Sequence, residues 1–182
     1  MSLSNFSGKT IALMVASGFD EAGFIAIQRA MMNAGAKLKI VSREAGLTNA
    51  WNGAGWGMSY PADSTLSNAL AIDYDALIVP AGKRNIEALK NEAHAKRVLR
   101  AFLRESMPVL LQGEAIELLD LIEGGTDRPH ASLETSAVDN NNENVPVIDE
   151  NLVTIASATE LLVEIAALNN VLGEAESETR AA

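Results

Sequence analysis

The chain has 182 residues, 48% of them hydrophobic, and a formal net charge of −10. That size and composition predict one domain with a sizeable core. The Lys and Arg residues are scattered, and are densest between Lys96 and Arg104, where we interpret them as a solvated helix face. Nucleic acid is therefore not an expected partner, because phosphate binding needs concentrated positive charge.

Two further absences narrow the class of protein. Cysteine is missing, which excludes disulfides, thiolate metal sites and cysteine nucleophiles. The apolar runs are too short to cross a membrane, and no secretory leader opens the sequence, so we expect a cytoplasmic protein without a membrane partner.

The first part of the sequence predicts a strand–helix–strand unit. Residues 9–16 form an apolar run typical of a strand buried on both faces. Asp20 is suited to cap the helix that follows, and Gly35 to end it. Residues 37–42 alternate as a second strand. Because one helix connects the two strands, they should run parallel.

Residues 46–71 are less regular and predict a small β excursion. Asn52-Gly53 is a hairpin turn signal and is flanked by Trp51, Trp56 and Tyr60. We interpret these aromatic side chains as local packing over the sheet edge, with a ligand site or a subunit contact as alternatives.

The next strand is expected at residues 75–80, followed by a short turn around 85–89. Residues 92–105 carry one apolar stripe and predict an amphipathic helix. A strand at 108–112 then leads into a second helical pattern. The segment 108–116 is therefore a strand, a sharp turn and a helix, which in α/β folds presents one residue at the carboxyl end of the sheet.

We call Gln112, Gly113 and Glu114 at that sharp turn the elbow. An enzyme would normally hold a nucleophile there on a strained backbone. Glycine stands at the position instead, and it adopts unusual backbone angles with the least strain. Glu114 suits the positive end of the helix that follows.

The last part of the sequence predicts two short strands and a closing helix. Residues 123–143 are polar, and an exposed loop is expected at 139–144. Strands at 145–149 and 152–156 bracket a turn. Ser157 and Glu160 form a capping box for a helix that should end at Gly173 and leave a frayed tail over 174–182.

Taken in order, four runs resemble the PfpI/ThiJ-type branch of the class I glutamine amidotransferase-like superfamily. They are KTIALMVASGFDEAGFIAIQRAMMNAGAKLKIVS, YDALIVPAG, MPVLLQGEA and VIDENLVTIAS. The resemblance implies an α/β fold of the flavodoxin-like three-layer type, with a mostly parallel central sheet, over residues 8–173. Residues 1–7 would be an extension. Family members are commonly dimers, so a homodimer or a larger symmetric assembly is also expected.

The family places a cysteine at the elbow, usually followed by histidine, and poises it with a glutamate on the first helix. These positions fall on Gly113, Glu114 and Gly23. Thiol-based peptidase, deglycase or glyoxalase chemistry is therefore not expected. His130 lies near where some members carry a second polar pocket residue.

One subset of the superfamily shows the same loss, namely the C-terminal domain of large-subunit haem catalases. Its elbow reads proline, three apolar residues, glycine and an acidic residue. In those enzymes the domain is an accessory to the haem-bearing barrel. The chain is too short for a haem domain, so the resemblance implies a free-standing relative or an excised domain.

Three hypotheses of function follow. The leading one is a catalytically degenerate domain that acts as a structural, oligomerising or small-ligand-binding module, with a link to oxidative stress. The second is a hydrolase or lyase with a rebuilt carboxylate site, and the third is a stress-linked module that binds a protein through Trp51 and Trp56. Neither a cofactor nor a metal is expected, since His94 and His130 are the only histidines. The candidate pocket residues are Glu21, Gly82, Gln112, Glu114 and His130.

Overall fold

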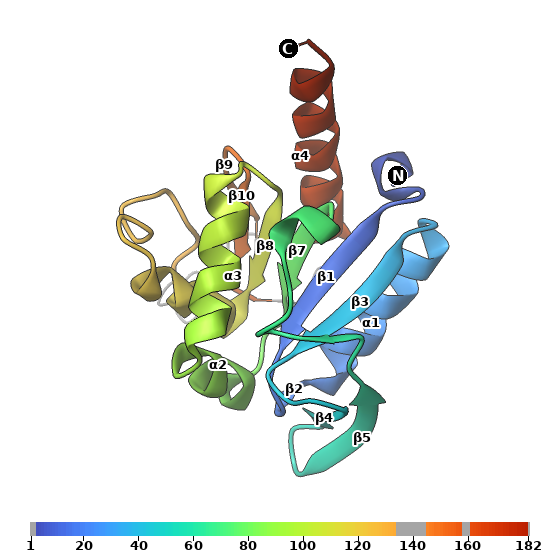
Figure 1. Ribbon diagram of the computed structural model, residues 1–182, viewed down its shortest axis with the longest axis vertical. Helices are drawn as coiled ribbons and strands as arrows, with labels where there is room; N and C mark the ends of the chain where they lie inside the picture. Colours follow the sequence, from blue (N-terminus) through green and yellow to red (C-terminus); the bar gives the residue numbers. More distant parts are fainter. Residues whose placement is uncertain (1–2, 134–144, 158–160, 182) are drawn as a thin grey trace.

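A seven-stranded sheet lies at the centre of the computed structural model, which describes residues 3–133, 145–157 and 161–181 (Figure 1). The strand order is β6-β3-β1-β7-β8-β10-β9. The strands are β1 (Thr10–Val15), β3 (Lys37–Ser42), β6 (Ser64–Thr65), β7 (Ala76–Val79), β8 (Val109–Gln112), β9 (Val147–Asp149) and β10 (Leu152–Ile155). Neighbouring strands run parallel except β9, which is antiparallel to β10. The predicted α/β fold with a mostly parallel sheet is confirmed.

Helices cover both faces of this sheet, as its doubly buried strands require. Helices α1 (Glu21–Asn33) and α4 (Leu161–Ala181) pack on one face, and α2 (Lys83–Lys90), α3 (Ala93–Arg104) and the 3₁₀ helix η3 (Gly113–Leu121) on the other. Two short 3₁₀ helices, η1 (Ser4–Phe6) and η2 (Ala71–Asp73), complete the set. Over the residues that the structure describes, no helix is long and apolar enough to span a membrane.

Alternate residues of β1 face opposite layers, which explains its unbroken apolar run. Leu13 packs with the α1 and α4 side chains, while Met14 packs with those of α2 and α3. The capping prediction for α1 is also confirmed. The carboxylate of Asp20 accepts a hydrogen bond from the amide of Gly23 at 2.6 Å, and Gly35 has a φ of +76° just past the helix end.

The irregular segment forms the predicted hairpin in a separate three-stranded sheet. It consists of β2 (Phe19–Asp20), β4 (Leu47–Trp51) and β5 (Trp56–Pro61), with β4 and β5 antiparallel. The Tyr60 ring packs on Phe24 at a centroid distance of 4.4 Å, so this aromatic side chain joins the core. Trp56 does not, because 59% of its surface is exposed.

Two local predictions differ from the structure. The segment after the elbow is a 3₁₀ helix, because its buried Ala115 and Leu118, and likewise Ile116 and Leu119, recur every three residues rather than at the α-helical period. The expected turn around 85–89 is an eight-residue helix, α2. Both differences follow from how the segments pack against the sheet.

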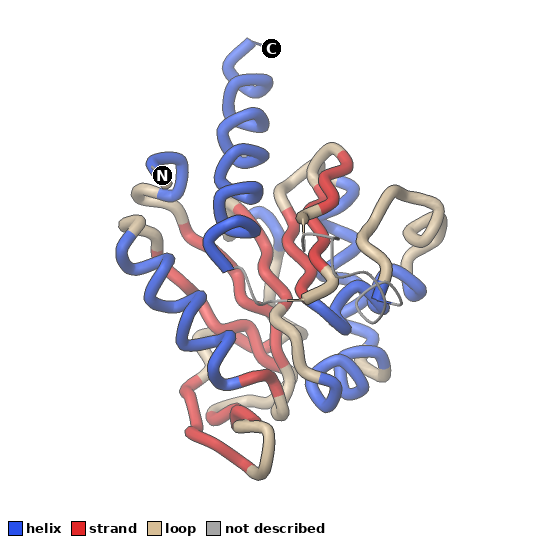
Figure 2. Tube along the Cα trace, turned by 180° about the vertical axis from the view of Figure 1, so that it is seen from behind, coloured by secondary structure: helices blue, strands red, loops and turns tan. Residues whose placement is uncertain are grey.

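The third correction concerns the end of the chain. Gly173 was expected to stop the last helix, but α4 continues to Ala181 and its C-terminal half stands clear of the body (Figures 1 and 2). Gly173 instead allows η1 to approach, since a Cβ there would lie 2.4 Å from Nδ2 of Asn5. That amide donates to the carbonyl of Asn169 at 2.7 Å. The expected loop at 139–144 and the Glu160 member of the capping box lie outside the described residues.

Candidate functional site

The elbow predicted from the sequence lies where β8 ends and η3 begins. Gly113 has a φ of +53°, in the left-handed region that side chains seldom adopt. A Cβ at this position would lie 3.1 Å from the Cβ of Ala81. The sharp turn is thus retained, but the group that it would present is a hydrogen atom.

Glu114 fastens the elbow to the turn after β7. Its carboxylate accepts a hydrogen bond from the backbone amide of Gly82 at 3.2 Å. Gly82 in turn has a φ of +135°, and a Cβ there would lie 2.9 Å from the carbonyl oxygen of Gly18. The loops after β1, β7 and β8 therefore converge at the carboxyl edge of the sheet, where open α/β sheets bind ligands.

Asn85 on α2 holds two of these loops together. Its side-chain oxygen accepts from the amide of Ala16 at 2.7 Å, and its Nδ2 donates to the carbonyl of Pro80 at 3.1 Å. The side chain is completely buried. Because both bonds replace water for main-chain groups at strand ends, Asn85 positions the edge rather than offering chemistry to it.

A cleft of about 440 Å³ opens between these loops and α2, and we call it the α2 cleft. Its lining includes Asp20, Trp51, Gly82, Lys83, Arg84 and Glu87. The guanidinium of Arg84 lies 4.1 Å from the centre of the Trp51 ring, and Trp56 packs edge-on against Trp51 at 5.4 Å. The cleft thus has an aromatic and cationic wall, with carboxylates beside it.

The structure separates the two other positions that family resemblance singled out on α1. Gly23 lies at the start of α1, where a Cβ would come within 2.9 Å of the Asp20 carboxylate. The Glu21 carboxylate accepts from the amide of Met58 at 2.8 Å, so it holds the hairpin. Glu21 and Glu114 share no hydrogen bond in the described part of the chain.

His130 lies beyond η3, in the segment that leads towards β9. Its Nδ1 is 2.6 Å from the carbonyl oxygen of Arg128, whose side chain pairs with Asp149 at the turn before β10. Within residues 3–133 and the later described ranges, His130 forms no hydrogen bond to Glu114. The contacts of His130 therefore tie it to Arg128 and not to the elbow.

A buried carboxyl that the sequence reading missed lies next to the elbow strand. Glu164 of α4 and Gln112 of β8 are 0% and 1% exposed. Both carboxylate oxygens of Glu164 and the Nε2 of Gln112 lack a hydrogen-bond partner of ordinary geometry among the described residues. Burial raises the pKa of Glu164 to about 7, and the Gln112 amide opposes part of this shift. A single charge in the apolar run 161–168 was the available signal.

The site can bind and orient a ligand more readily than it can attack one. The Glu114 carboxylate is already bonded to a main-chain amide, and the chain has no cysteine to place beside it. Among the described residues, no group of three or more His, Asp or Glu side chains could hold a metal ion.

Comparisons with known proteins bear on this fold. The sequence model of the DJ-1/PfpI family matches residues 9–166. None of the curated proteins that were compared matches the chain significantly. A ThiJ/PfpI domain protein from Brachyspira murdochii superposes with a TM-score of 0.71 at 19% identity, covering 92% of this chain and 98% of that one. For oxidised DJ-1 from Toxoplasma gondii the values are 0.69, 15%, 94% and 98%.

A two-domain protein from Anabaena variabilis, with a DJ-1/ThiJ/PfpI-like and a ferritin-like domain, gives a TM-score of 0.73 at 19% identity. The match covers 91% of this chain but only 48% of that protein, so the chain spans about half its length. At such identities the neighbours establish the fold, and the family match covers most of the sequence. The chain belongs to the DJ-1/PfpI family.

Proposed function

We propose that this chain is a DJ-1/PfpI domain without thiol chemistry that binds a small carboxylate-bearing ligand in the α2 cleft. The observation that carries the proposal is the retained elbow with glycine at its apex. The Glu114 carboxylate occupies the Gly82 amide, while Lys83 and Arg84 at the start of α2 supply positive charge beside the cleft. A helix start and two cations favour an anionic group.

Intrinsic fluorescence tests this proposal because the only two tryptophans are Trp51 and Trp56. Titration with acetate, malonate or citrate should give a saturable change in fluorescence, since Trp51 lines the cleft. Lys83→Gln should weaken the response, whereas Lys37→Gln, an exposed change on β3, should leave it unaltered. No saturable response to any of the three carboxylates would overturn the proposal.

The alternative is a hydrolase or lyase with a carboxylate-based site, and Glu114 is the residue that favours it. Glu114 is partly buried at the elbow and faces the turn after β7. Turnover of an ester or similar substrate that disappears in Glu114→Gln, with the fold intact, would support this alternative over a binding module.

We also propose that the hairpin face takes part in self-association. Leu47, Trp56 and Met58 expose 60%, 59% and 65% of their surfaces, which is apolar area that a subunit contact would cover. Light scattering should give more than a monomer mass, and a Trp56→Ser/Met58→Ser variant should lower it. A protein partner bound through Trp51 and Trp56 is the competing explanation, and a monomeric wild type would favour it.

The kinship to catalase C-terminal domains, and with it a stress-linked role, forms a separate proposal. It rests on the elbow run from Pro108 to Glu114, which has glycine and an acidic residue where the thiol members have cysteine and histidine. Affinity purification from its own cells should bring down a haem catalase, visible by haem absorbance. A preparation free of haem would count against it.

A further inference from the structure

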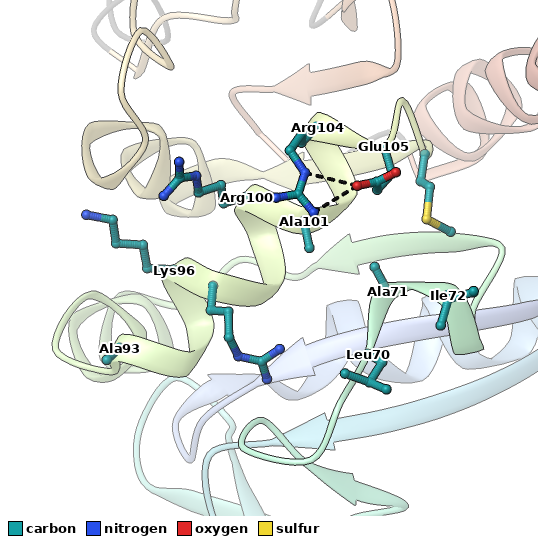
Figure 3. A pocket seen from close by; sticks show the side chains of 11 residues that line it. Leu70, Ala71, Ile72, Ala93, Lys96, Arg100, Ala101, Arg104 and Glu105 are labelled. Carbon is teal, nitrogen blue, oxygen red and sulfur yellow. Dashed lines mark hydrogen bonds and ion pairs between the residues drawn. The ribbon is translucent and has the colours of Figure 1, made fainter.

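A groove of about 930 Å³ runs between α3 and the η2 segment, on a face that the proposed ligand site does not use. We call it the α3 groove. One wall holds the exposed side chains of Leu70 and Ile72, which are 53% and 85% accessible. The opposite wall is α3 with Lys96 and Arg100, as Figure 3 shows. An apolar strip beside a row of cations is unusual on a chain with a net charge of −10.

The cations of the α3 groove are largely free of carboxylates. Within the part of the chain that the structure describes, Lys96, Arg97 and Arg100 form no ion pair, while Arg104 pairs with Glu105 at 2.8 Å. Arg97 donates to two carbonyl oxygens, which fixes its guanidinium without neutralising it. The groove therefore keeps a positive potential that can select an acidic partner.

The complementary surface is at the end of α4. Its last two turns project from the body and carry Glu174 and Glu178, both exposed and one helical turn apart (Figures 1 and 2). Lys96 and Arg100 are separated by the same one turn on α3. Neither Glu174 nor Glu178 forms an ion pair among the described residues, whereas Glu176 between them pairs with Lys9 of its own chain.

Groove and projecting helix end lie side by side in one subunit. Met107 borders the α3 groove and also a second pocket, whose other wall contains Ala175 and Thr179 of α4. A two-fold axis near Met107 would bring each α4 end onto the other copy's groove, and so make the same contact twice. We propose that two copies of this chain associate in this way, with Glu174 and Glu178 of each facing Lys96 and Arg100 of the other. The methylene stems of the glutamates would then cover Leu70 and Ile72.

Charge reversal provides a stringent test. A groove variant (Lys96→Glu/Arg100→Glu) and a tail variant (Glu174→Lys/Glu178→Lys) should each associate roughly tenfold more weakly, or worse, because both halves of the contact then place like charges together. Mixing the two variants should restore association, since both halves of the mixed dimer pair opposite charges. A single chain with all four changes should also associate. The control Arg29→Glu/Lys37→Glu makes the same charge change on another exposed surface.

Sedimentation velocity at low salt gives the masses, and circular dichroism establishes that each variant is folded. Association of the wild type should weaken as salt is raised, because the pairs are exposed. A monomeric wild type at low salt, variants that assemble as the wild type does, or a mixture that stays monomeric would overturn the proposal. The hairpin contact is a separate surface, so a Trp56→Ser/Met58→Ser chain should keep this salt dependence.

Discussion

The carboxylate of Glu114 accepts a hydrogen bond from the backbone amide of Gly82 at 3.2 Å, which links the turn after β8 to the turn after β7. The bond spans the edge of the sheet where the family's reactive group would lie. A side chain at the first position of η3 thus stabilises the elbow from within, since no nucleophile needs access to that amide.

The first prediction concerns this link. Glu114→Ala should lower the free energy of unfolding by about 1–3 kcal/mol, because it removes a charge-assisted bond and leaves the Gly82 amide without its partner. Glu114→Gln should cost less, since its amide oxygen still accepts. Chemical denaturation measures both, with Glu123→Ala as an exposed control. Equal losses in Glu114→Ala and the control would show that the bond contributes nothing.

The second prediction tests whether Gly113 occupies the vacated nucleophile position. Gly113→Cys places the chain's only thiol at a helix start, where partial positive charge favours the thiolate. It should react with iodoacetamide faster than the thiol of Arg29→Cys, on the exposed face of α1. The left-handed backbone and the approach to Ala81 should cost on the order of 1–3 kcal/mol.

Adding Gly23→Glu should enhance that reactivity if the family's carboxyl position is correctly assigned. The new Cβ would lie 2.9 Å from the Asp20 carboxylate, so the cap of α1 must move, at a cost of about 1 kcal/mol. A Gly113→Cys thiol with the unperturbed pKa of about 8.5 and ordinary reactivity would mean that the elbow assignment is wrong.

Much of the fold could be predicted because each parallel strand is an apolar run between turn signals. Thr10–Val15 and Ala76–Val79 are examples, and their burial on both faces leaves no other assignment. The site was harder, since sequence order does not give distances across the sheet. Gly82 and Glu114 were named as pocket candidates and do meet, whereas His130 bonds to Arg128 instead.

Glu164 escaped prediction for a similar reason. A glutamate in a helix is normally solvated, and only tertiary packing reveals that this one lies under α4 beside Gln112. Gly173 was misjudged because a glycine near a helix end usually stops it. Here the requirement for glycine comes from Asn5, which is 168 residues away in the sequence and approaches α4 through η1.

The third prediction is a pH dependence of stability. Glu164 has a pKa of about 7 in the folded protein and 4.5 as its ordinary value, so the folded state keeps a proton that the unfolded state releases. Its contribution is therefore fully present below pH 4.5 and is lost as the pH rises to about 7. The loss should be about 3 kcal/mol.

Glu164→Gln removes the titrating group while keeping the shape of the side chain. Denaturation curves at pH 5 and pH 8 should show that the wild type loses more stability between the two than the variant does. Other groups titrate over this range in both proteins, so the difference isolates Glu164. Parallel pH profiles for the two proteins would contradict the assigned burial.

The last prediction concerns the contact between η1 and α4. Gly173→Ala should destabilise the protein by about 1 kcal/mol or more, even though alanine favours a helix, because its Cβ would collide with the Asn5 amide. Asn5→Ala removes that amide together with its hydrogen bond to the Asn169 carbonyl. In the Asn5→Ala background the collision is absent, so Gly173→Ala should become stabilising by up to about 1 kcal/mol. A double-mutant cycle from urea denaturation therefore gives a coupling of opposite sign to either single loss. Additive effects would mean that η1 does not hold Gly173 in place, and that the glycine has another cause.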